Sequence, residues 1–354
     1  MLNANGISVI ICCYNSSSRL PETLMHLANQ SLPEKINWEL IVVNNASTDN
    51  TASVAEIEWA KYNLEISLRV VDQPVPGQSA ARDKGYEVAN HEYLLYVDDD
   101  NWLKPDYLVN AYEIMQQHPN IGILGGQCEA AFEINQPLWF SEKQSIYAVG
   151  KQGAHSGPLS SKNNYLYGAG CVIRKSAWET LRRQNFVFLT KGRTGKQLAA
   201  GDDVELNKAI RMLGYDLWYD ERLQFTHFMS AGRLNWDYLI RIGKGSASSS
   251  LPLMVYDYFL STKNNSLTDF TLMYWRAIFK RLAGLLIRPH ILIRSFFIRK
   301  REGDLEAFDA MRSLILLRRL IGSFGEAKSY FRQVNKLKEN IGKHYSSHEK
   351  LYAW

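Results

Sequence analysis

The sequence of 354 residues is poor in cysteine, and its cysteines form no recognisable structural set. The four residues Cys12, Cys13, Cys128 and Cys171 include no CxxC pair, and the first two are adjacent in an apolar segment. This usage argues against a disulfide scaffold or a zinc site, and it fits a reducing compartment. The first ten residues, MLNANGISVI, have no basic region and no long apolar core, so a signal peptide is not expected.

Several other signatures are missing as well. No repeat with a period of roughly 20–50 residues is present, and no segment reaches the 18 or so apolar residues of a membrane-spanning helix. The sequence has no GxGxxG or Walker A pattern and no nucleic-acid recognition motif. What it does have is 46% hydrophobic residues, enough for the core of one large domain or two ordinary ones.

The first hundred residues alternate between short apolar runs and helical patterns. The runs are rich in β-branched residues and nearly continuous, which is typical of strands buried on both faces; they cover residues 7–13, 38–43, 66–71 and 93–97. Helical spacing separates them at residues 19–29, 51–62 and 79–89. This alternation predicts a mostly parallel α/β sheet, in which ligands bind at the carboxyl ends of the strands.

Later segments are predicted less regularly. We expect helices at residues 107–117 and 203–213, strands at 121–126 and 165–174, and loops at 141–164 and 191–201.

The segment YVDDDNWL, residues 96–103, carries an apolar strand directly into three carboxylates. Adjacent carboxylates repel one another, so the run is either a solvated turn or a site for a divalent cation. Asp98 and Asp100 alternate along an extended segment and should face one side, while Asp99 faces away and is either solvated or structural. Because the loops CYNSSS and NNASTD follow other predicted strands, they should lie near this run.

Five segments in order resemble the motifs of family 2 glycosyltransferases with the GT-A fold: SVIICCYN, ELIVVNNASTDNT, PGQSAARDKG, YVDDDNWL and GDDVELNKAIRMLGYDLWYDERLQFTH. The resemblance covers about residues 6–230. It implies a Rossmann-like sheet flanked by helices, with a nucleotide-sugar-binding half at 1–115 and an acceptor-binding half at 116–250. Residues 251–354 would form a basic, helical C-terminal region.

The resemblance implies a set of donor-binding residues. Mn²⁺ or Mg²⁺ would be held by Asp100, with Asp98 and His227 assisting, and would neutralise the diphosphate leaving group. The remaining donor contacts implied are Tyr14, Asn15, Asn44, Asn45, Asp49, Arg82 and Asp99. The family's paired aspartates are Asn44 and Asn45 here, which leaves the nucleobase open, with UDP favoured over GDP. Most of these residue types also form turns or helix caps.

The resemblance also implies the catalytic and acceptor residues. Asp203 would remove the proton of the acceptor hydroxyl, with Asp202 beside it, and the product would have inverted anomeric configuration. Both residues would otherwise cap the helix that follows. The acceptor site would be floored by Trp102, Tyr167, Gly168, Ala169 and Gly170, of which the aromatic residues could equally belong to the core.

Charge is distributed unevenly along the chain. Residues 270–354 contain 17 Lys and Arg against 7 Asp and Glu, whereas residues 1–269 contain 24 against 29. Apolar residues fall on one helical face between Tyr274 and Ile287, and basic residues lie off it. This pattern predicts an amphipathic helix on an anionic membrane surface, or a helix packed on the catalytic domain.

The sequence therefore predicts a metal-dependent, inverting glycosyltransferase that acts on a carbohydrate or lipid-linked sugar. Its expected setting is polysaccharide or glycolipid biosynthesis in the cytoplasm, on the inner face of the cell membrane, without nucleic acid. Two alternatives stay open: an inactive nucleotide-binding scaffold at the membrane, and a nucleotidyltransferase. The intact Asp98, Asp100 and Asp203 argue against the first, and the missing Gly-rich phosphate loop argues against the second.

Overall fold

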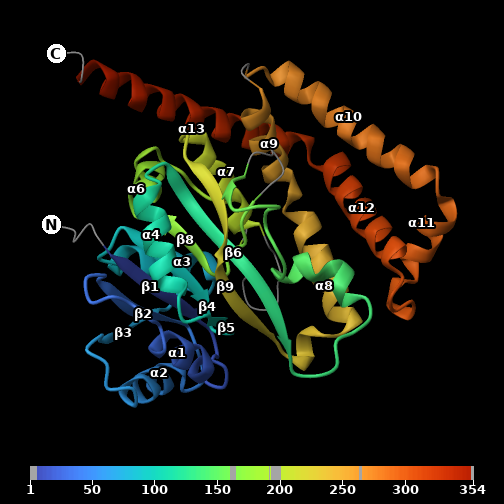
Figure 1. Cartoon of the computed structure of the whole chain (residues 1–354). Coiled ribbons are helices and arrows are strands. Elements are labelled where there is room, and N and C mark those ends of the chain that lie inside the picture. Colours follow the sequence, from blue (N-terminus) through green and yellow to red (C-terminus); the bar gives the residue numbers. More distant parts are fainter. Residues whose placement is uncertain (1–5, 160–164, 191, 193–200, 263–264, 352–354) are drawn as a thin grey trace.

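The computed structural model describes residues 6–159, 165–190, 192, 201–262 and 265–351. In this part of the chain one sheet of nine strands is sandwiched between helices, and a group of C-terminal helices packs along one side (Figure 1). The strand order is β3-β2-β1-β4-β8-β6-β9-β5, with β7 paired to β9. This architecture confirms the predicted α/β class and the C-terminal helical region.

The first half of the sheet is parallel and forms as expected. It contains β1 (Ile7–Cys13), β2 (Trp38–Asn45), β3 (Leu68–Gln73) and β4 (Tyr93–Asp98). The connecting helices are α1 (Leu20–Ala28), α2 (Thr51–Ala60) and α3 (Gln78–Val88). The predicted boundaries are confirmed to within two residues. Because β1 pairs Cys13 with Asn44 and Cys12 with Asp98, the polar ends of three strands meet at one edge of the sheet.

Each buried strand contributes side chains to two hydrophobic cores, since successive side chains point to opposite faces of the sheet. Val9 and Ile11 pack with α1, α2 and α4 (Tyr107–Gln117), while Ile10 packs on the other face with α3, α6 (Lys175–Arg183) and α7 (Asp202–Met212). All three side chains have no exposed surface. The continuous apolar runs are therefore explained by a sheet that is covered on both sides.

The second half of the sheet differs more from the prediction. It contains β5 (Asn101–Leu103), β6 (Ile121–Phe132), β7 (Gly157–Pro158), β8 (Cys171–Arg174) and β9 (Asp216–Met229). The strand predicted at 121–126 continues through the Gly125–Gly126 pair by a register shift against β9. The strand predicted at 165–174 is wrong in its first part, because only Cys171–Arg174 pairs with neighbours.

The two predicted loops have different outcomes. The stretch 141–164 was predicted as loop throughout, but it contains most of α5 (Phe140–Lys143), the 3-10 turn η1 (Gln144–Tyr147) and β7. Its residues 160–164 lie outside the described residues, as do 191 and 193–200 of the other loop.

Helices and two further 3-10 turns form the remainder of the chain. They are η2 (Ala231–Arg233), α8 (Trp236–Ser248), α9 (Ser250–Ser261), α10 (Leu267–Leu286), α11 (Pro289–Phe296), η3 (Ile298–Lys300), α12 (Leu305–Gly322) and α13 (Phe324–Leu351). Among the described residues no helix has the length and apolarity needed to cross a bilayer. Helix α12 packs against both α8 and α10, so the C-terminal region is joined to the sheet domain.

The apolar face predicted for residues 274–287 divides in two. Tyr274, Ile278 and Leu285 pack into the core, and the Tyr274 hydroxyl donates a hydrogen bond to the Leu320 carbonyl. Trp275 and Phe279, which were predicted for the same face, lie on the outside with 39% and 64% of their surfaces exposed. The helix thus packs on the protein with one stripe and exposes a second apolar stripe.

Candidate active site

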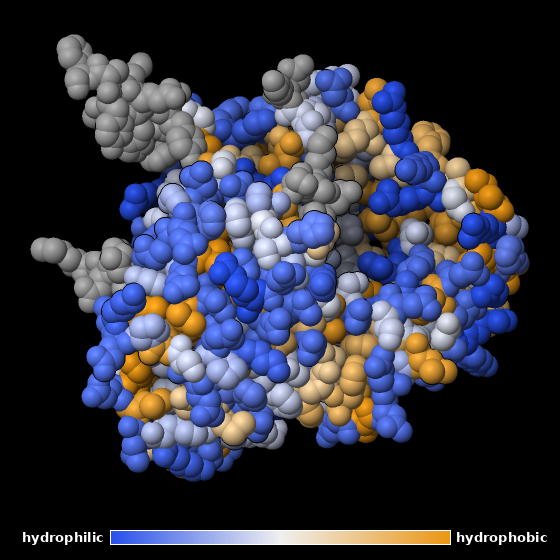
Figure 2. All heavy atoms as spheres, viewed as in Figure 1, coloured by the Kyte–Doolittle hydropathy of each residue, from blue (hydrophilic) through white to orange (hydrophobic). Residues whose placement is uncertain are grey.

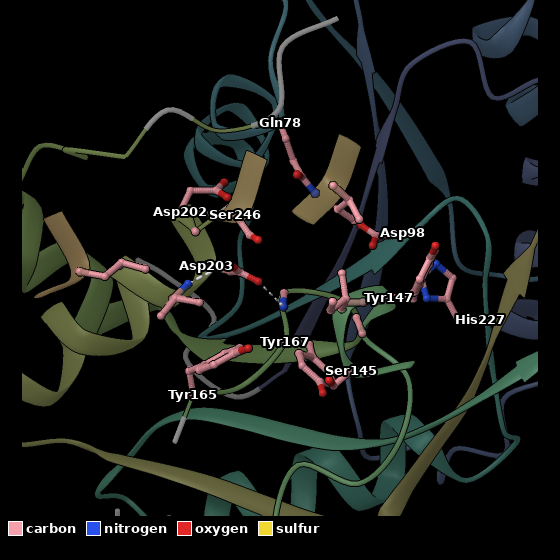
Figure 3. A pocket seen from close by; sticks show the side chains of 18 of the residues that line it. Gln78, Asp98, Ser145, Tyr147, Tyr165, Tyr167, Asp202, Asp203, His227 and Ser246 are labelled. Atoms are coloured by element: carbon pink, nitrogen blue, oxygen red, sulfur yellow. Dashed lines mark hydrogen bonds between the residues drawn. The ribbon is translucent and has the colours of Figure 1, made fainter. Parts of the chain in front are cut away.

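A cavity of about 410 Å³ lies at the carboxyl edge of the parallel strands, where the sequence places its motifs. Its lining side chains come from α3, β4, α7, α8, β9 and α12, so residues far apart in sequence converge on it. Figure 3 shows Asp98 and His227 on one side of this cavity, opposite Asp203 and Ser246. Residues of the predicted site that line it are Arg82, Asp98, Tyr167, Gly168, Ala169, Asp202, Asp203 and His227.

The three consecutive aspartates point to three different environments. Strand β4 ends at Asp98, which lines the cavity, and a tight turn follows before β5. Asp99 is 9% exposed and accepts a 2.6 Å bond from Arg19, so of its two predicted environments the structure has the buried, ion-paired one. Asp100 is buried against two cavity-lining residues, His227 and Arg233.

Asp100 is held as a carboxylate by its neighbours. Its Oδ1 lies 3.2 Å from His227 Nε2 and its Oδ2 lies 3.0 Å from Arg233 Nη1. Burial alone would raise the pKa of Asp100, but the nearby His227 and Arg233 outweigh burial and hold this pKa well below the usual range. The site therefore keeps a charged carboxylate beside the cavity at any physiological pH.

Arg233 Nη1 lies 3.0 Å from both Asp100 Oδ2 and His227 Nε2, so this pair could give a cation one oxygen and one nitrogen ligand once the guanidinium moves away. Within the described residues, no three His, Cys, Asp or Glu side chains converge tightly enough to form a complete metal cluster. The Nδ1 atom of His227 is buried without a hydrogen-bond partner. These residues fit an ion that takes few protein ligands and completes its shell with phosphate oxygens and water, as Mg²⁺ does in nucleotide-binding enzymes.

Asp202 and Asp203 begin helix α7 after Gly201, whose φ of +127° is a conformation that favours glycine. Asp203 Oδ2 accepts a 3.1 Å bond from the Gly168 backbone N–H, and its Oδ1 accepts a 2.8 Å bond from the Val204 backbone N–H. Burial and the adjacent charge of Asp202 raise the pKa of Asp203 above its ordinary value. A fixed carboxylate with a raised pKa at a cavity wall has the properties of a general base.

Arg82 supplies the positive charge on this side of the cavity. Its Nη1 lies 3.5 Å from Asp202 Oδ2, and both side chains are largely buried. A Cβ added at Gly168 would lie 2.4 Å from Arg82 Nη2 and 3.2 Å from Asp203 Cβ. Glycine at this position therefore lets the guanidinium and the carboxylate approach the same backbone segment.

The loops after β1 and β2 are tied together by the residues predicted to contact the nucleotide. The Asn15 side chain accepts a 2.8 Å bond from the Thr48 backbone N–H, and the Asp49 carboxylate accepts bonds from Ser17 and Thr51. Burial would raise the pKa of Asp49, but the bonds from Thr51 and Ser17 together outweigh it and lower this pKa to about 2. These contacts join the two loops at the strand ends and tie Asp49 to the first residue of α2. The alternative prediction that Asp49 is the N-cap of this helix is wrong, because the N-cap is Asn50.

Asn44, Asn45 and Tyr14 lie in different environments. The Asn45 amide is fully used, since it donates to the Gln73 and Val75 carbonyls and accepts from the Gly77 backbone N–H. The Asn44 amide donates to Asp72, but its Oδ1 atom has no partner. The Tyr14 ring is 52% exposed, so it lies at the surface rather than in the core.

Two of the residues predicted for the acceptor site do not line the cavity. The Trp102 ring stacks between Phe228 and His26, at centroid distances of 5.4 and 5.8 Å. Gly170, with φ of +66°, accepts a hydrogen bond at its carbonyl from Tyr107. Trp102 therefore belongs to an aromatic stack and Gly170 to a backbone turn, while Tyr167, Gly168 and Ala169 form the wall.

Other lining residues were not anticipated from the sequence. They include Gln78, Tyr147, Tyr165, Arg233, Tyr238, Ser246 and Arg312. Gln78 lies in the motif segment PGQSAARDKG but was not singled out there, and the others lie outside the five motif segments. Arg312 comes from α12, 85 residues after the last motif ends at His227. The aromatic members give the cavity the flat, amphipathic walls that suit sugar rings, because tyrosine offers both a ring face and a hydroxyl.

Comparison with known proteins identifies the family that this chain resembles. Residues 8–181 match the model of "Glycosyl transferase family 2". Poly-beta-1,6-N-acetyl-D-glucosamine synthase of Staphylococcus epidermidis is 23% identical over 274 residues, which are 76% of this chain and 60% of that protein. The putative glycosyltransferase EpsH of Bacillus subtilis is 35% identical over 102 residues, 29% of this chain and 28% of its own length. The chain thus spans less than two thirds of these relatives.

A solved structure shares the fold along almost the whole chain. Residues 1–349 of S. aureus TarS, in complex with UDP-GlcNAc, superpose with a TM-score of 0.50 at 16% identity. The match covers 97% of this chain and 92% of the TarS chain, which includes the C-terminal helices.

Proposed function

Since the chain belongs to glycosyl transferase family 2, we propose that it transfers a sugar from a nucleoside diphosphate to an acceptor hydroxyl with inversion. The observation that carries this proposal is the position of Asp203. Its carboxylate lies in a cavity opposite Asp98 and His227, so a sugar between them would face a base on one side and a charged anchor on the other. This arrangement suits a single in-line displacement.

In the proposed step the acceptor hydroxyl oxygen attacks the anomeric carbon as Asp203 takes the hydroxyl proton. The bond from that carbon to the diphosphate oxygen breaks, and the diphosphate leaves with the bonding electrons. Arg82 and Arg233 lie close enough to the cavity to bind phosphate oxygens through charge-assisted bonds. A Mn²⁺ or Mg²⁺ held by Asp100 and His227, with Asp98 nearby, would neutralise charge on the leaving group.

We further propose UDP as the nucleotide and a carbohydrate or lipid-linked sugar as the acceptor. The complex of TarS with UDP-GlcNAc supports the first choice. The name of the S. epidermidis relative supports a role in polysaccharide synthesis.

Nucleotide binding tests the donor site directly. In calorimetry, UDP should bind at least about tenfold more tightly with Mn²⁺ than with EDTA, because an ion held by Asp100 would neutralise charge on the diphosphate. Asp100→Asn should lose this gain, whereas Glu129→Gln, at an exposed position, should keep it. A folded protein that binds no nucleotide in either condition would instead favour an inactive scaffold.

The exposed stripe of the C-terminal region supports a peripheral membrane location. On α10 and α11 the outward apolar side chains are Leu272, Trp275, Phe279, Leu282, Leu286, Ile293 and Phe296. Arg276, Lys280 and Arg288 are exposed beside them. Figure 2 shows apolar and hydrophilic side chains mixed along this side of the molecule. An apolar stripe flanked by arginine and lysine matches an anionic lipid surface, and we propose that it docks there.

Vesicle co-sedimentation tests this docking. The protein should bind vesicles that contain phosphatidylglycerol but not vesicles of phosphatidylcholine alone. Added salt should weaken this binding. The double variant Phe279→Ser/Leu286→Ser should bind at least about tenfold more weakly, since each side chain gains up to 1.5–3 kcal/mol on full burial. Leu138→Ser, at a fully exposed apolar residue elsewhere, is the control. Equal binding by the two variants would contradict the proposal.

A further inference from the structure

Arg312 is a cavity-lining arginine whose charge has no carboxylate partner in the described part of the chain. It projects from α12 into the cavity that contains Asp203. Its Nη2 donates a 3.4 Å bond to Ser246 Oγ, and its guanidinium carbon lies 5.8 Å from the centre of the Phe308 ring. Its Nε is buried and has no hydrogen-bond partner among the described residues.

Among the described residues, the Arg312 guanidinium thus has neither an acceptor for its Nε–H nor a carboxylate counter-ion. A buried N–H without an acceptor costs free energy, and a partly desolvated cation without a counter-ion costs more. The other cationic residues near the catalytic groups are paired: Arg82 lies by Asp202 and Arg233 by Asp100. Among the described residues Arg312 is therefore the cavity-lining arginine whose charge is not already balanced by a carboxylate.

The position of Arg312 separates it from the donor. Ser246, to which it bonds, lies on the Asp203 side of the cavity, away from Asp98 and His227 (Figure 3). The donor diphosphate belongs with Asp98, Asp100 and His227, and so an anion at Arg312 would come from the other substrate.

A neighbouring cavity extends the same surface. It has a volume of about 290 Å³ and shares Tyr165, Val204, Ser250 and Leu253 with the first. Arg281 of α10 lines it, and burial lowers the pKa of this guanidinium. Arg281 Nη1 donates a 3.3 Å bond to the Ala277 carbonyl of its own helix. A second arginine therefore lines the adjoining cavity, together with the apolar residues Leu316 and Leu320.

We propose that Arg312 is a specificity-determining residue that binds an anionic group, phosphate or carboxylate, on the acceptor. The planar fork of arginine can bind such a group through two parallel bonds, which lysine cannot do. The C-terminal helices would then contribute to the choice of acceptor as well as to membrane docking. This inference rests on the proposed transfer function and names the chemical class of its acceptor.

Binding to the protein saturated with UDP and Mn²⁺ tests the inference, because the diphosphate then engages Arg82 and Arg233 and leaves Arg312 to the probe. The probes are glucose 6-phosphate, glucuronate and inorganic phosphate, with glucose as the neutral reference. We expect at least one anionic probe to bind more tightly than glucose, with an affinity that falls as salt is added. Arg312→Gln should weaken this binding about tenfold or more, and Arg312→Lys should restore only part of it.

Arg318→Gln is the matched control, since Arg318 is exposed on the same helix and its charge does not face the cavity. Unchanged UDP affinity and melting temperature in Arg312→Gln would show that the loss is local. The inference is wrong if anionic probes bind no better than glucose, if Arg312→Gln and Arg318→Gln behave alike, or if Arg312→Gln weakens UDP itself. A wild-type protein that transfers no sugar to any acceptor would refute the proposed function instead, since Arg312-dependent binding of an anion can be measured without turnover.

Discussion

Replacing Asp203 with Asn is expected to lower kcat by about 10²–10⁴-fold, the usual contribution of a positioned general base. The amide is nearly the same size as the carboxylate, so the cavity keeps its shape, but it cannot take the acceptor proton. Donor binding should survive, because Asp98 and His227, the latter paired with Asp100, lie on the other side of the cavity (Figure 3). The measurement is sugar transfer by the purified variant, alongside UDP affinity. An unchanged rate in a folded Asp203→Asn protein would show that Asp203 is not the base.

The pH profile gives an independent test of the same assignment. The base works as the carboxylate, so kcat/KM should fall as the pH falls through the pKa of Asp203. Burial and the charge of Asp202 raise that pKa, and the acidic limb should therefore lie at a higher pH than for an exposed aspartate. Asp202→Asn removes the neighbouring negative charge and should move the limb to lower pH. An acidic limb at the same pH in Asp202→Asn would show that Asp202 does not raise the pKa of Asp203.

The parallel half of the fold was predictable because the patterns that define its strands and helices lie within short segments of the sequence. Strands covered on both faces need continuous apolar runs, and the helices between them need a regular apolar stripe. The strand register then brings Asn44 and Asp98 to the same edge without any further information, since β1 pairs with both β2 and β4. Resemblance to a known family supplied Arg82 and Asp203, which lie more than a hundred residues apart and meet at Gly168.

The rest depended on tertiary contacts that no local pattern encodes. Asp99 could be expected to face away from Asp98, but its ion pair with Arg19 required the position of α1. Trp102 looked equally suited to a sugar floor and to a core, and only the positions of Phe228 and His26 decide between them.

The inward-facing side of helix α10 also could not be predicted from the sequence pattern. Its apolar residues cover more than one face, so the periodicity identifies a helix but does not say which stripe packs inward. Packing of Tyr274 and Ile278 on the protein leaves Trp275 and Phe279 outside, where the proposed docking needs them. Likewise, Arg312 has no motif around it, and only the contact of α12 with α8 brings it to the cavity.

Gly168→Ala is expected to reduce sugar transfer by about a hundredfold, through the addition of a single methyl group. The new Cβ would lie 2.4 Å from Arg82 Nη2, a distance that atoms cannot adopt, and 3.2 Å from Asp203 Cβ. The flexible end of Arg82 must move, and Asp203 must shift by a few tenths of an ångström. A misplacement of about 1 Å in a catalytic constellation can cost about 10²-fold in rate. Because a flexible side-chain end yields easily, the melting temperature should change little.

Gly322→Ala, where a Cβ would meet no atom within 4 Å, is the matched control and should retain full activity. Equal rates for the two variants would mean that the spacing of Arg82 and Asp203 across Gly168 does not limit transfer.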